Sequence, residues 1–474
     1  MFLGQRPILN AYRLGEGHVL NDVQSQLNAT PVHQVFRPTT LAELEEIIAL
    51  SRRDQRPISI AGGRHSMGGQ QFGKDTWHID TTEFKQVLDL DEERGLVTAE
   101  AGIQWPELIE QLHQRQSSNR LDVWTIREKQ TGVDAVTLGG CLSSNVHGRG
   151  LSFPPIVHDV ESFQLLDAAG ELQQCSRSEN SELFSLAIGG YGLFGVITQV
   201  TLRLVRRFKV RRKVERIEVK NLLDRYNERL RQGFVFGDCQ YSADLSGDAE
   251  SHPGILPFYE PAPADTPVTE SPVHFAAADW ARLYRLMRSD KPRAFEEYAA
   301  HYLKTDGQVY WSDTHQLASD FVGHREAVEA NKGTEMITEV YLRHEQLLPF
   351  FATIRSDLVA SKTDITYGTI RFIRADRETF LPWAKEDSVC VVCNLHVRHT
   401  EEGIAKSQAD FRKILDRIVE FQGSFFLTYH RWATPEHVAA CYPTIRDFFR
   451  LKRQYDPPER FQSEWYRHYV AHFR

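Results

Sequence analysis

The sequence is poor in cysteine, has no excess of basic residues and contains no long apolar run. Six cysteines in 474 residues are too few for a disulfide scaffold and are typical of a reducing compartment, so we expect a cytoplasmic protein. Lys and Arg number 56 against 64 Asp and Glu, and the net charge of -8 gives no reason to expect nucleic acid as a partner. Nowhere do about 18 apolar residues follow one another, so no transmembrane segment is expected, while peripheral membrane contact stays open.

The N-terminal residues lack the pattern of a signal peptide. Gly4, Pro7 and Asn10 interrupt them, and no apolar run precedes a small-residue cleavage site. A chain of 474 residues also exceeds what one hydrophobic core usually supports, so we expect two or more domains.

Short strands, glycine turns and single helices alternate between residues 30 and 204. Thr40 and Glu43 form a capping box ahead of a helix-patterned stretch, and the apolar strand at residues 57–61 runs straight into a glycine-dense turn. Two hairpins follow, one closed by Gly95 and one turning at Gly170. This order predicts an α+β fold rather than a doubly wound sheet.

The second half of the chain begins with two unusual segments. Residues 203–213 hold seven basic side chains, for which a solvated edge strand at a domain boundary is the first interpretation and an anionic surface or membrane site the second. Residues 241–279 contain six prolines and predict a long loop or lid. Strand-like and amphipathic helical runs then predict a second α+β domain, closed by an aromatic tail that docks on a core.

One glycine motif is misleading. Gly190, Gly192 and Gly195 satisfy G-x-G-x-x-G, but the β-branched alternation that follows them predicts a strand, whereas a dinucleotide fold needs a helix there. We therefore reject the Rossmann interpretation. Glycine clusters still leave backbone N–H groups uncovered, and several such groups can converge on a diphosphate.

Three glycine blocks in order carry a family resemblance. AGGRHSMGGQ, TLGGCLSSNVHG and AIGGYGLFGVITQVTLRL resemble the FAD-binding domain of the vanillyl-alcohol-oxidase superfamily, the FAD-linked oxidases with a PCMH-type domain. These include aldonolactone, alditol and cytokinin oxidoreductases. The second and third blocks, and parts of the last hundred residues, are most similar to the decaprenylphosphoryl-ribose oxidase branch, while the middle of the chain is poorly matched.

The resemblance implies FAD as the cofactor and a set of residues around it. The first block matches the loop that binds the FAD pyrophosphate, and the other two match positions around the isoalloxazine and the rest of the cofactor. The implied cofactor-binding residues are Gly62, Gly63, Arg64, His65, Ser66, Met67, Leu138, Gly139, Gly140, Ser143, Asn145, His147, Gly148, Gly192, Gly195, Val196 and Ile197.

His65 occupies the position that bonds covalently to the flavin 8α-methyl in many relatives, so we expect a covalent flavin. A neutral imidazole is a nucleophile, whereas a lysine would be protonated near neutral pH. The ribose-oxidase branch lacks this histidine and holds FAD without a bond. A plain hydrogen-bonding role for His65 is the alternative.

The substrate side follows from the chemistry of removing a hydride from a CH–OH carbon, which needs a base or an alkoxide-stabilising cation. We expect His396 or Tyr429 to take the proton and Arg371 to stabilise negative charge, with Glu339 and Asn394 lining the site, because the resemblance places the strands that carry these residues over the flavin ring. The ribose-oxidase branch has a lysine where Tyr429 falls and a cysteine where His396 falls. Aldonolactone and alditol oxidases carry a lysine after a His-Trp pair, which is absent here, so the substrate stays open.

Other catalytic motifs are not present in the sequence. Cys390 and Cys393 have a zinc-like spacing, but no second pair occurs and their segment reads as a buried strand, so we predict core cysteines and no metal. Neither a G-x-S-x-G motif nor a Walker loop occurs.

The sequence thus predicts a two-domain α+β FAD oxidoreductase. Residues 1–205 would bind FAD, 206–440 would form the substrate domain, and 441–474 would return to the FAD domain. The predicted reaction is hydride transfer from a CH–OH carbon of a sugar-like, polyol or lactone substrate to flavin N5, with oxygen or another acceptor reoxidising the flavin. The alternatives are a flavoenzyme of the same fold acting on another donor or a C=C bond, and a non-catalytic flavin-binding subunit.

Overall fold

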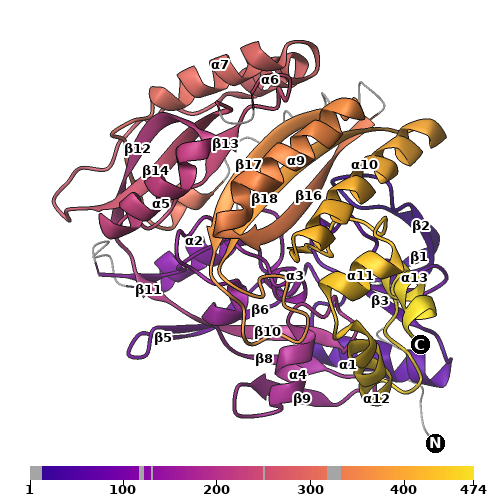
Figure 1. The fold of residues 1–474 in the computed structure, drawn as a ribbon. Coiled ribbons are helices and arrows are strands. Elements are labelled where there is room, and N and C mark those ends of the chain that lie inside the picture. The colour runs from indigo at the N-terminus through magenta and orange to yellow at the C-terminus, as the bar shows by residue number, and fades with distance from the viewer. Residues whose placement is uncertain (1–12, 117–121, 130–131, 249–250, 318–332) are drawn as a thin grey trace, which may run out of the picture.

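The computed structural model describes residues 13–116, 122–129, 132–248, 251–317 and 333–474. Residues 1–12, which belong to the segment judged for a signal peptide, lie outside this range. Helices and sheets are mixed along the whole described chain, which confirms the expected α+β class (Figure 1). A large sheet occupies the upper part of the molecule in this view, and two smaller sheets lie below it.

The first small sheet joins the two ends of the chain. Its strand order is β1 (Arg13–Leu20), β2 (Thr30–Phe36), β4 (Trp77–Asp80) and β3 (Ile58–Ala61), and helix α1 (Leu41–Arg53) begins at the predicted capping box. The Ile58 amide donates to Arg460 O at 2.7 Å, and the Gln462 amide donates to Ile58 O at 2.8 Å. The C-terminal segment therefore packs on β3, and α13 lies beside this sheet in Figure 1.

The second small sheet has five antiparallel strands in the order β5 (Val87–Asp91), β6 (Leu96–Glu100), β10 (Val196–Arg203), β8 (Val160–Leu166) and β9 (Leu172–Ser176). Both predicted hairpins are present in it. Strand β10 follows the GYGLFG motif directly, which confirms the rejection of a Rossmann helix at that place. Helices α2 (Trp105–Arg115), α3 (Leu138–Ser144) and α4 (Ser181–Ala187) complete this part.

The large sheet has eight strands, and the chain enters it immediately after the short pair β7 (Trp124–Thr125) and β11 (Val205–Arg206). The strand order is β15 (Val309–Trp311), β12 (Lys209–Glu218), β14 (Pro253–Ala262), β13 (Cys239–Tyr241), β17 (Ile365–Ile373), β18 (Ser388–Arg398), β16 (Gly333–Arg343) and β19 (Ser424–Phe425). The helices described in this second half of the chain are α5 (Leu222–Arg231), α6 (Ala277–Ser289), α7 (Lys291–Leu303), α9 (Leu347–Ala360), α10 (Glu401–Glu420), α11 (Pro435–Cys441), α12 (Ile445–Tyr455) and α13 (Glu464–Phe473).

Strand β14 corrects the prediction of a long loop over residues 241–279. It carries Pro253, Pro257 and Pro261, yet it pairs with β12 along its whole length. The Tyr259 amide donates to Phe236 O, so odd-numbered residues direct their backbone groups away from β12. Strand β13 pairs only near Ile255 on that side. The prolines therefore lie at positions where the absence of an N–H removes few of the hydrogen bonds between strands.

The two faces of the large sheet have different neighbours. On one face Phe372 of β17 stacks against Tyr226 of α5, with ring centroids 3.6 Å apart. On the other face Tyr367, an odd number of residues away, meets Tyr298 of α7 edge-on at 6.4 Å. Because successive side chains of a strand alternate between faces, β17 presents Tyr367, Thr369 and Arg371 together on the second face.

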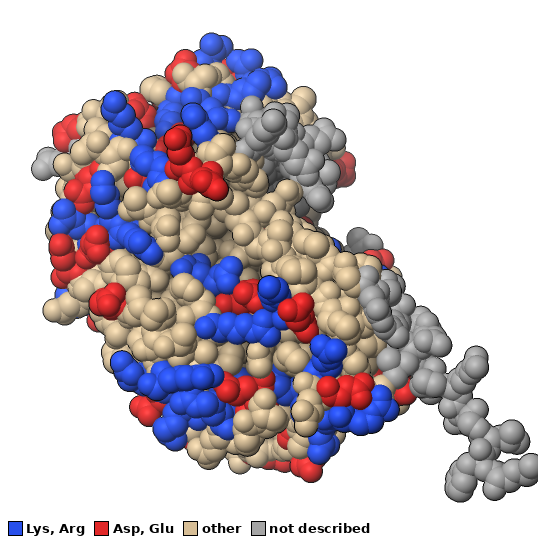
Figure 2. All heavy atoms as spheres, turned by 90° about the vertical axis from the view of Figure 1, so that its right-hand side faces the viewer, with Lys and Arg blue, Asp and Glu red and all other residues tan. Residues whose placement is uncertain are grey.

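Charges of both signs are mixed on one face of the molecule. On the face shown in Figure 2, basic and acidic side chains lie interspersed. Among the described residues, no helix combines the length and the apolar character that a membrane crossing requires.

A buried ion pair connects the large sheet to the first part of the chain. Asp313 has no exposed side-chain surface, and its carboxylate is 2.9 Å from His113 of α2, from Thr125 of β7 and from Arg207. Burial opposes its charge, but the hydrogen bond from His113 and the Arg207 guanidinium outweigh burial and lower the Asp313 pKa to about 2.

We predict that Asp313→Asn lowers the free energy of unfolding by about 3 kcal/mol, since removing one partner leaves a buried charge uncompensated. Urea unfolding should show the difference in full above the unfolded pKa of about 4, because a lowered folded-state pKa stabilises only where the unfolded carboxyl is ionised. The difference should shrink as the pH falls towards 2. Asp447→Asn on the exposed face of α12 is the control, and equal losses in both variants would contradict the assignment.

Candidate active site

A cavity of about 710 Å³ lies between the glycine-rich loops and the second face of the large sheet. From the first part of the chain it is lined by Gly62–Met67, by Gly139, Gly140 and Ser143, and by Gly192, Gly195 and Ile197. From the large sheet it is lined by Glu339, Arg371, Asn394 and, beyond β19, Tyr429. The structure therefore brings the three glycine blocks to one place, opposite most of the predicted substrate-side residues.

The first glycine block packs so closely on the chain before α3 that side chains are excluded. A Cβ at Gly62 would lie 1.9 Å from Thr137 Oγ1, and one at Gly63 would lie 2.3 Å from the carbonyl oxygen of Ala135. Arg64 then adopts a left-handed conformation with φ of 58°. This close approach explains why the sequence needs two glycines here.

The turn leaves four successive N–H groups without a protein partner. The amides of Gly63, Arg64, His65 and Ser66 donate to no other group of the described chain, whereas the next amide, of Met67, donates to Thr428 O at 3.0 Å. Successive uncovered amides beside a left-handed residue form a concave anion site. A diphosphate has the charge and the acceptor oxygens to satisfy them, so these residues fit the pyrophosphate of FAD.

The third glycine block packs on the second. The Tyr191 amide donates to Ser143 O and the Gly189 amide to Leu142 O, both at 2.9 Å. Gly192 has φ of 71° and would bring a Cβ no closer than 3.8 Å to another residue, so it leaves open space at the cavity wall. The second and third blocks thus form one continuous surface.

His65 stands at the cavity with its ring held from two sides. Its Nδ1 lies 3.2 Å from the amide nitrogen of Gln24, and the ring also contacts the backbone carbonyl of Ala135. Burial lowers the pKa of His65 to about 4. The imidazole is therefore neutral at physiological pH, which is the form that acts as a nucleophile.

The opposite wall of the cavity is built by the register of three strands. Glu339 of β16, Val392 of β18 and Thr369 of β17 are cross-strand neighbours. The adjacent row towards one end holds Asn394, and Arg371 stands opposite Cys390 in the row towards the other end. Alternation places these side chains on one face, so residues far apart in the sequence meet at the cavity.

Glu339 is the centre of a buried polar network. One carboxylate oxygen lies 3.5 Å from His147 Nε2 and accepts the Tyr341 hydroxyl at 3.1 Å, while the other lies 3.9 Å from Arg371 Nη1. Burial opposes the charge of Glu339, but His147 and Arg371 outweigh burial and hold its pKa below the usual range. Burial and the charge of Glu339 in turn raise the pKa of the neighbouring Tyr429.

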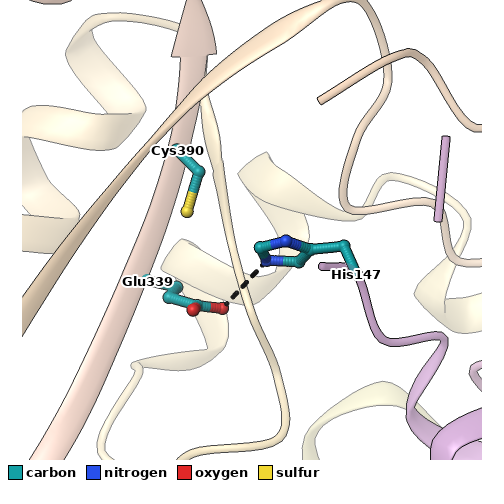
Figure 3. A group of neighbouring side chains, drawn as sticks. All are labelled: His147, Glu339 and Cys390. Atoms are coloured by element: carbon teal, nitrogen blue, oxygen red, sulfur yellow. Dashed lines mark ion pairs between the residues drawn. The ribbon is translucent and has the colours of Figure 1, made fainter. Parts of the chain in front are cut away.

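His147, Glu339 and Cys390 also form a group with metal-ligating atom types, as Figure 3 shows. Their potential ligand atoms lie within 4.8 Å of one another, and the dashed line marks the His147–Glu339 ion pair. The Arg371 guanidinium and the Tyr341 hydroxyl compete for the same carboxylate, so the network is already supplied with donors. We therefore interpret it as a proton-handling group rather than a metal centre. Cys390 and Cys393 are buried and unpaired, as predicted for core cysteines.

Some predicted residues do not line the cavity. His396 packs its ring against Gly333 and is fixed through Nδ1 at 2.9 Å from Glu335, and it does not line the cavity. Asn145 holds Asp376 through its side chain at 2.8 Å and has φ of 49° as the C-cap of α3. The remaining predicted residues outside the lining are Leu138, His147, Gly148 and Val196.

Other lining residues were missed from the sequence. Gln24, which contacts His65, comes from a loop with no motif, and the strand alternation that exposes Thr369 and Val392 was not used for them. A large aromatic part of the cavity, together with Arg149, comes from segments with no recognisable pattern, and Arg212 belongs to the basic segment 203–213. For the strand residues, the period of two was the available signal.

The fold and the site define an FAD-binding domain of the FAD-linked oxidase type. Residues 32–176, which include the first two glycine blocks, match the family described as FAD binding domain. The chain carries this domain, and the prediction of FAD as its cofactor is confirmed.

Curated relatives of this chain include oxidases and dehydrogenases of sugar lactones. L-gulonolactone oxidase of Bos taurus is 31% identical over 201 residues, which are 42% of this chain and 44% of that protein. L-gulono-1,4-lactone dehydrogenase of Mycobacterium tuberculosis is 33% identical over 194 residues, 41% of this chain and 42% of its own. D-arabinono-1,4-lactone oxidase of Debaryomyces hansenii is 26% identical over 206 residues, 41% of this chain and 35% of its own. The similarity thus spans less than half of each protein.

We predict that Gly63→Ala purifies with several-fold less flavin than the wild type, because its Cβ would collide with a backbone oxygen that has no freedom to move aside. The ratio of flavin to protein absorbance measures this. Gly247→Ala is the matched control, since a Cβ there would meet nothing closer than 3.9 Å. Full flavin content in Gly63→Ala would contradict the role of this loop.

Proposed function

We propose that this protein is an FAD-dependent oxidoreductase that oxidises a CH–OH carbon of a sugar-like substrate such as a polyol or lactone. The observation that carries the proposal is the cavity itself, which has unpaired amides of Gly63–Ser66 on one side and the Glu339 network on the other. The names of the lactone oxidases and dehydrogenases that resemble the chain support this class of substrate.

Bound FAD supplies the hydride acceptor at N5, and the chain's own residues handle the proton and the charge. We assign Arg371 to the developing negative charge on the substrate oxygen, because its Nε and Nη1 are buried and lack hydrogen-bond partners. Tyr429 takes the hydroxyl proton of the substrate while its own phenolic proton passes to the Glu339 carboxylate. Loss of one hydride and one proton leaves the carbonyl product.

His396, the other predicted proton acceptor, has no part in this proposal. Its Nδ1 is held by Glu335 and the ring does not line the cavity. We assign it to positioning Glu335, which does line the cavity. Asn394 stays a candidate substrate contact on the same wall.

We further propose the domain boundaries given above, with residues 1–205 and 441–474 on the cofactor side and 206–440 on the substrate side. The change from the small sheets to the large sheet after β11 supports the boundary at 205. Oxygen or another acceptor reoxidises the flavin in this scheme, and the cytoplasmic location stays a prediction from cysteine content.

The flavin is, in our proposal, bound covalently through His65. The neutral, cavity-lining imidazole supports this bond, since its Nε2 side carries no competing side-chain partner among the described residues. We predict that acid precipitation of the wild type leaves yellow colour in the pellet. His65→Ala should release the flavin to the supernatant, and His472→Ala, an exposed histidine of α13, should not. Free flavin from the wild type would remove the bond but leave the cofactor assignment intact.

Anaerobic mixing with candidate polyols and lactones tests the reaction. We predict bleaching of the flavin absorbance by at least one of them, with a rate reduced about 100-fold in Tyr429→Phe, the usual size of a lost proton transfer. His396→Asn should lower the rate far less and serves as the control for this assignment. If His396→Asn abolishes bleaching and Tyr429→Phe does not, the proton acceptor is wrong. No bleaching by any donor would favour the non-catalytic subunit.

A further inference from the structure

The cavity continues beyond the flavin side into an aromatic chamber, which we define by Tyr302, Tyr310, Trp311 and Tyr367 with Arg149 and Arg212. Most of this chamber comes from residues that follow the FAD-binding domain match, which ends at residue 176. A ring-bearing ligand fits such a lining, because aromatic faces stack on sugar rings and other flat groups.

The chamber contains part of the basic segment 203–213, whose role the sequence left open. Four of its arginines have an acidic partner nearby. The pairs are Arg203 with Glu161, Arg206 with Asp122, Arg207 with Asp313 and Arg211 with Glu260, and Lys209 donates to the carbonyl of Ala264. This pairing removes the basis for a membrane or polyanion surface at this segment.

Arg212 differs from these four arginines. No carboxylate of the described chain lies within 4.0 Å of its guanidinium. Instead Nε donates to the Tyr259 hydroxyl at 2.8 Å, and the guanidinium lies 4.9 Å from the ring centroid of Tyr310 and 5.7 Å from that of Tyr302. Tyrosine faces hold a cation in place but do not neutralise it.

Strand alternation explains why neighbours in the sequence differ. Arg211 of β12 pairs with the glutamate directly opposite on β14, while Arg212 turns to the other face of the sheet, into the cavity. A guanidinium that is fixed, partly desolvated and without an acid is unfavourable unless an anion joins it.

A second arginine stands near this group. Arg149 lines the cavity and is 3.4 Å from the buried Asp238, so its own charge is balanced. Burial, Arg149 and Arg212 together lower the pKa of His315 to about 3, which shows that both guanidinium groups act on one place. Arg149 also acts on Arg371. All three arginines line the same cavity.

We propose that the chamber binds the anionic group of the substrate, with Arg212 as its primary ligand, so that the substrate is a sugar carrying a carboxylate or a phosphate. This rests on the proposed function for the hydroxyl that is oxidised. The sugar ring stacks on the tyrosines while the acidic group meets a cavity-lining guanidinium that has no carboxylate partner among the described residues. The diphosphate of FAD has its own site at the amides of Gly63–Ser66.

Binding to the flavin-loaded protein, measured by perturbation of the flavin absorbance, tests the proposal without turnover. The probes are D-glucuronate, D-glucose 6-phosphate and neutral D-glucose. We expect one of the two anions to bind about tenfold or more tightly than D-glucose, and which one it is identifies carboxylate or phosphate as the recognised group. Equal binding of charged and neutral sugars, or no binding of either anion, would overturn the proposal.

Two variants locate the effect. Arg212→Gln should lower the preference for the anion over D-glucose about tenfold. Arg211→Gln, one residue along the same strand and facing away, should leave this preference unchanged. Arg212→Lys retains the charge and should keep part of the preference if Arg212→Gln does not fold. A preference that survives in both Arg212 variants and is lost in Arg211→Gln would place the anion elsewhere. Binding is measured without turnover. An anion preference in the binding experiment without bleaching of the flavin by any donor would therefore contradict the proposed function but support the anion site.

Discussion

Four backbone amides without an acceptor are the constraint on which the rest of this structure depends. A buried or half-buried N–H that finds no partner costs free energy, and the described part of the chain offers no acceptor to the amides of Gly63 through Ser66. The close contact of Gly63 with Ala135 fixes these amides in place, so they remain available whether or not a ligand is bound. An anion therefore completes the fold locally, and the diphosphate of FAD does so while anchoring the flavin at the cavity.

The large sheet supplies the chemistry through its period of two. The alternation that turns Phe372 towards α5 turns Arg371 towards the cavity, and the register then sets Arg371 diagonally from Glu339. None of these groups is placed by a loop. The sheet holds the Glu339 carboxylate and the Arg371 guanidinium at fixed separations, and Tyr429 joins them from the turn after β19, which suits a site that must orient a hydroxyl and a carbon together.

The glycine blocks and most of the strand residues at the cavity were predictable from the sequence, whereas the aromatic chamber and the role of Arg212 were not. Glycine blocks signal backbone access locally, so the first two could be assigned before any contact was known. His396 shows the limit of prediction on the substrate side. It lies two residues from Asn394, and this separation of about 7 Å along the strand is enough to leave His396 outside the cavity lining. Arg212 was indistinguishable from its basic neighbours, because only cross-strand register reveals which side chain has an acid opposite it. Strand β14 was predicted to be a loop because it contains prolines. Only the strand pairing shows that the backbone positions of these prolines face away from β12, where an N–H is not needed.

Charge distribution gives the two halves different tasks. The chain carries a net charge of -8, yet the cavity is lined by Arg64, Arg149, Arg212 and Arg371 against only Glu335 and Glu339. A positive interior within a negative protein draws anions to one place and gains from burying them there, since low dielectric strengthens each contact. The amides at Gly63–Ser66 and the Arg212 guanidinium are separate groups of this cavity that an anion would stabilise. The diphosphate of FAD satisfies the amides, but a neutral substrate would leave the Arg212 guanidinium without an anion. The guanidinium therefore points to an acidic group on the substrate.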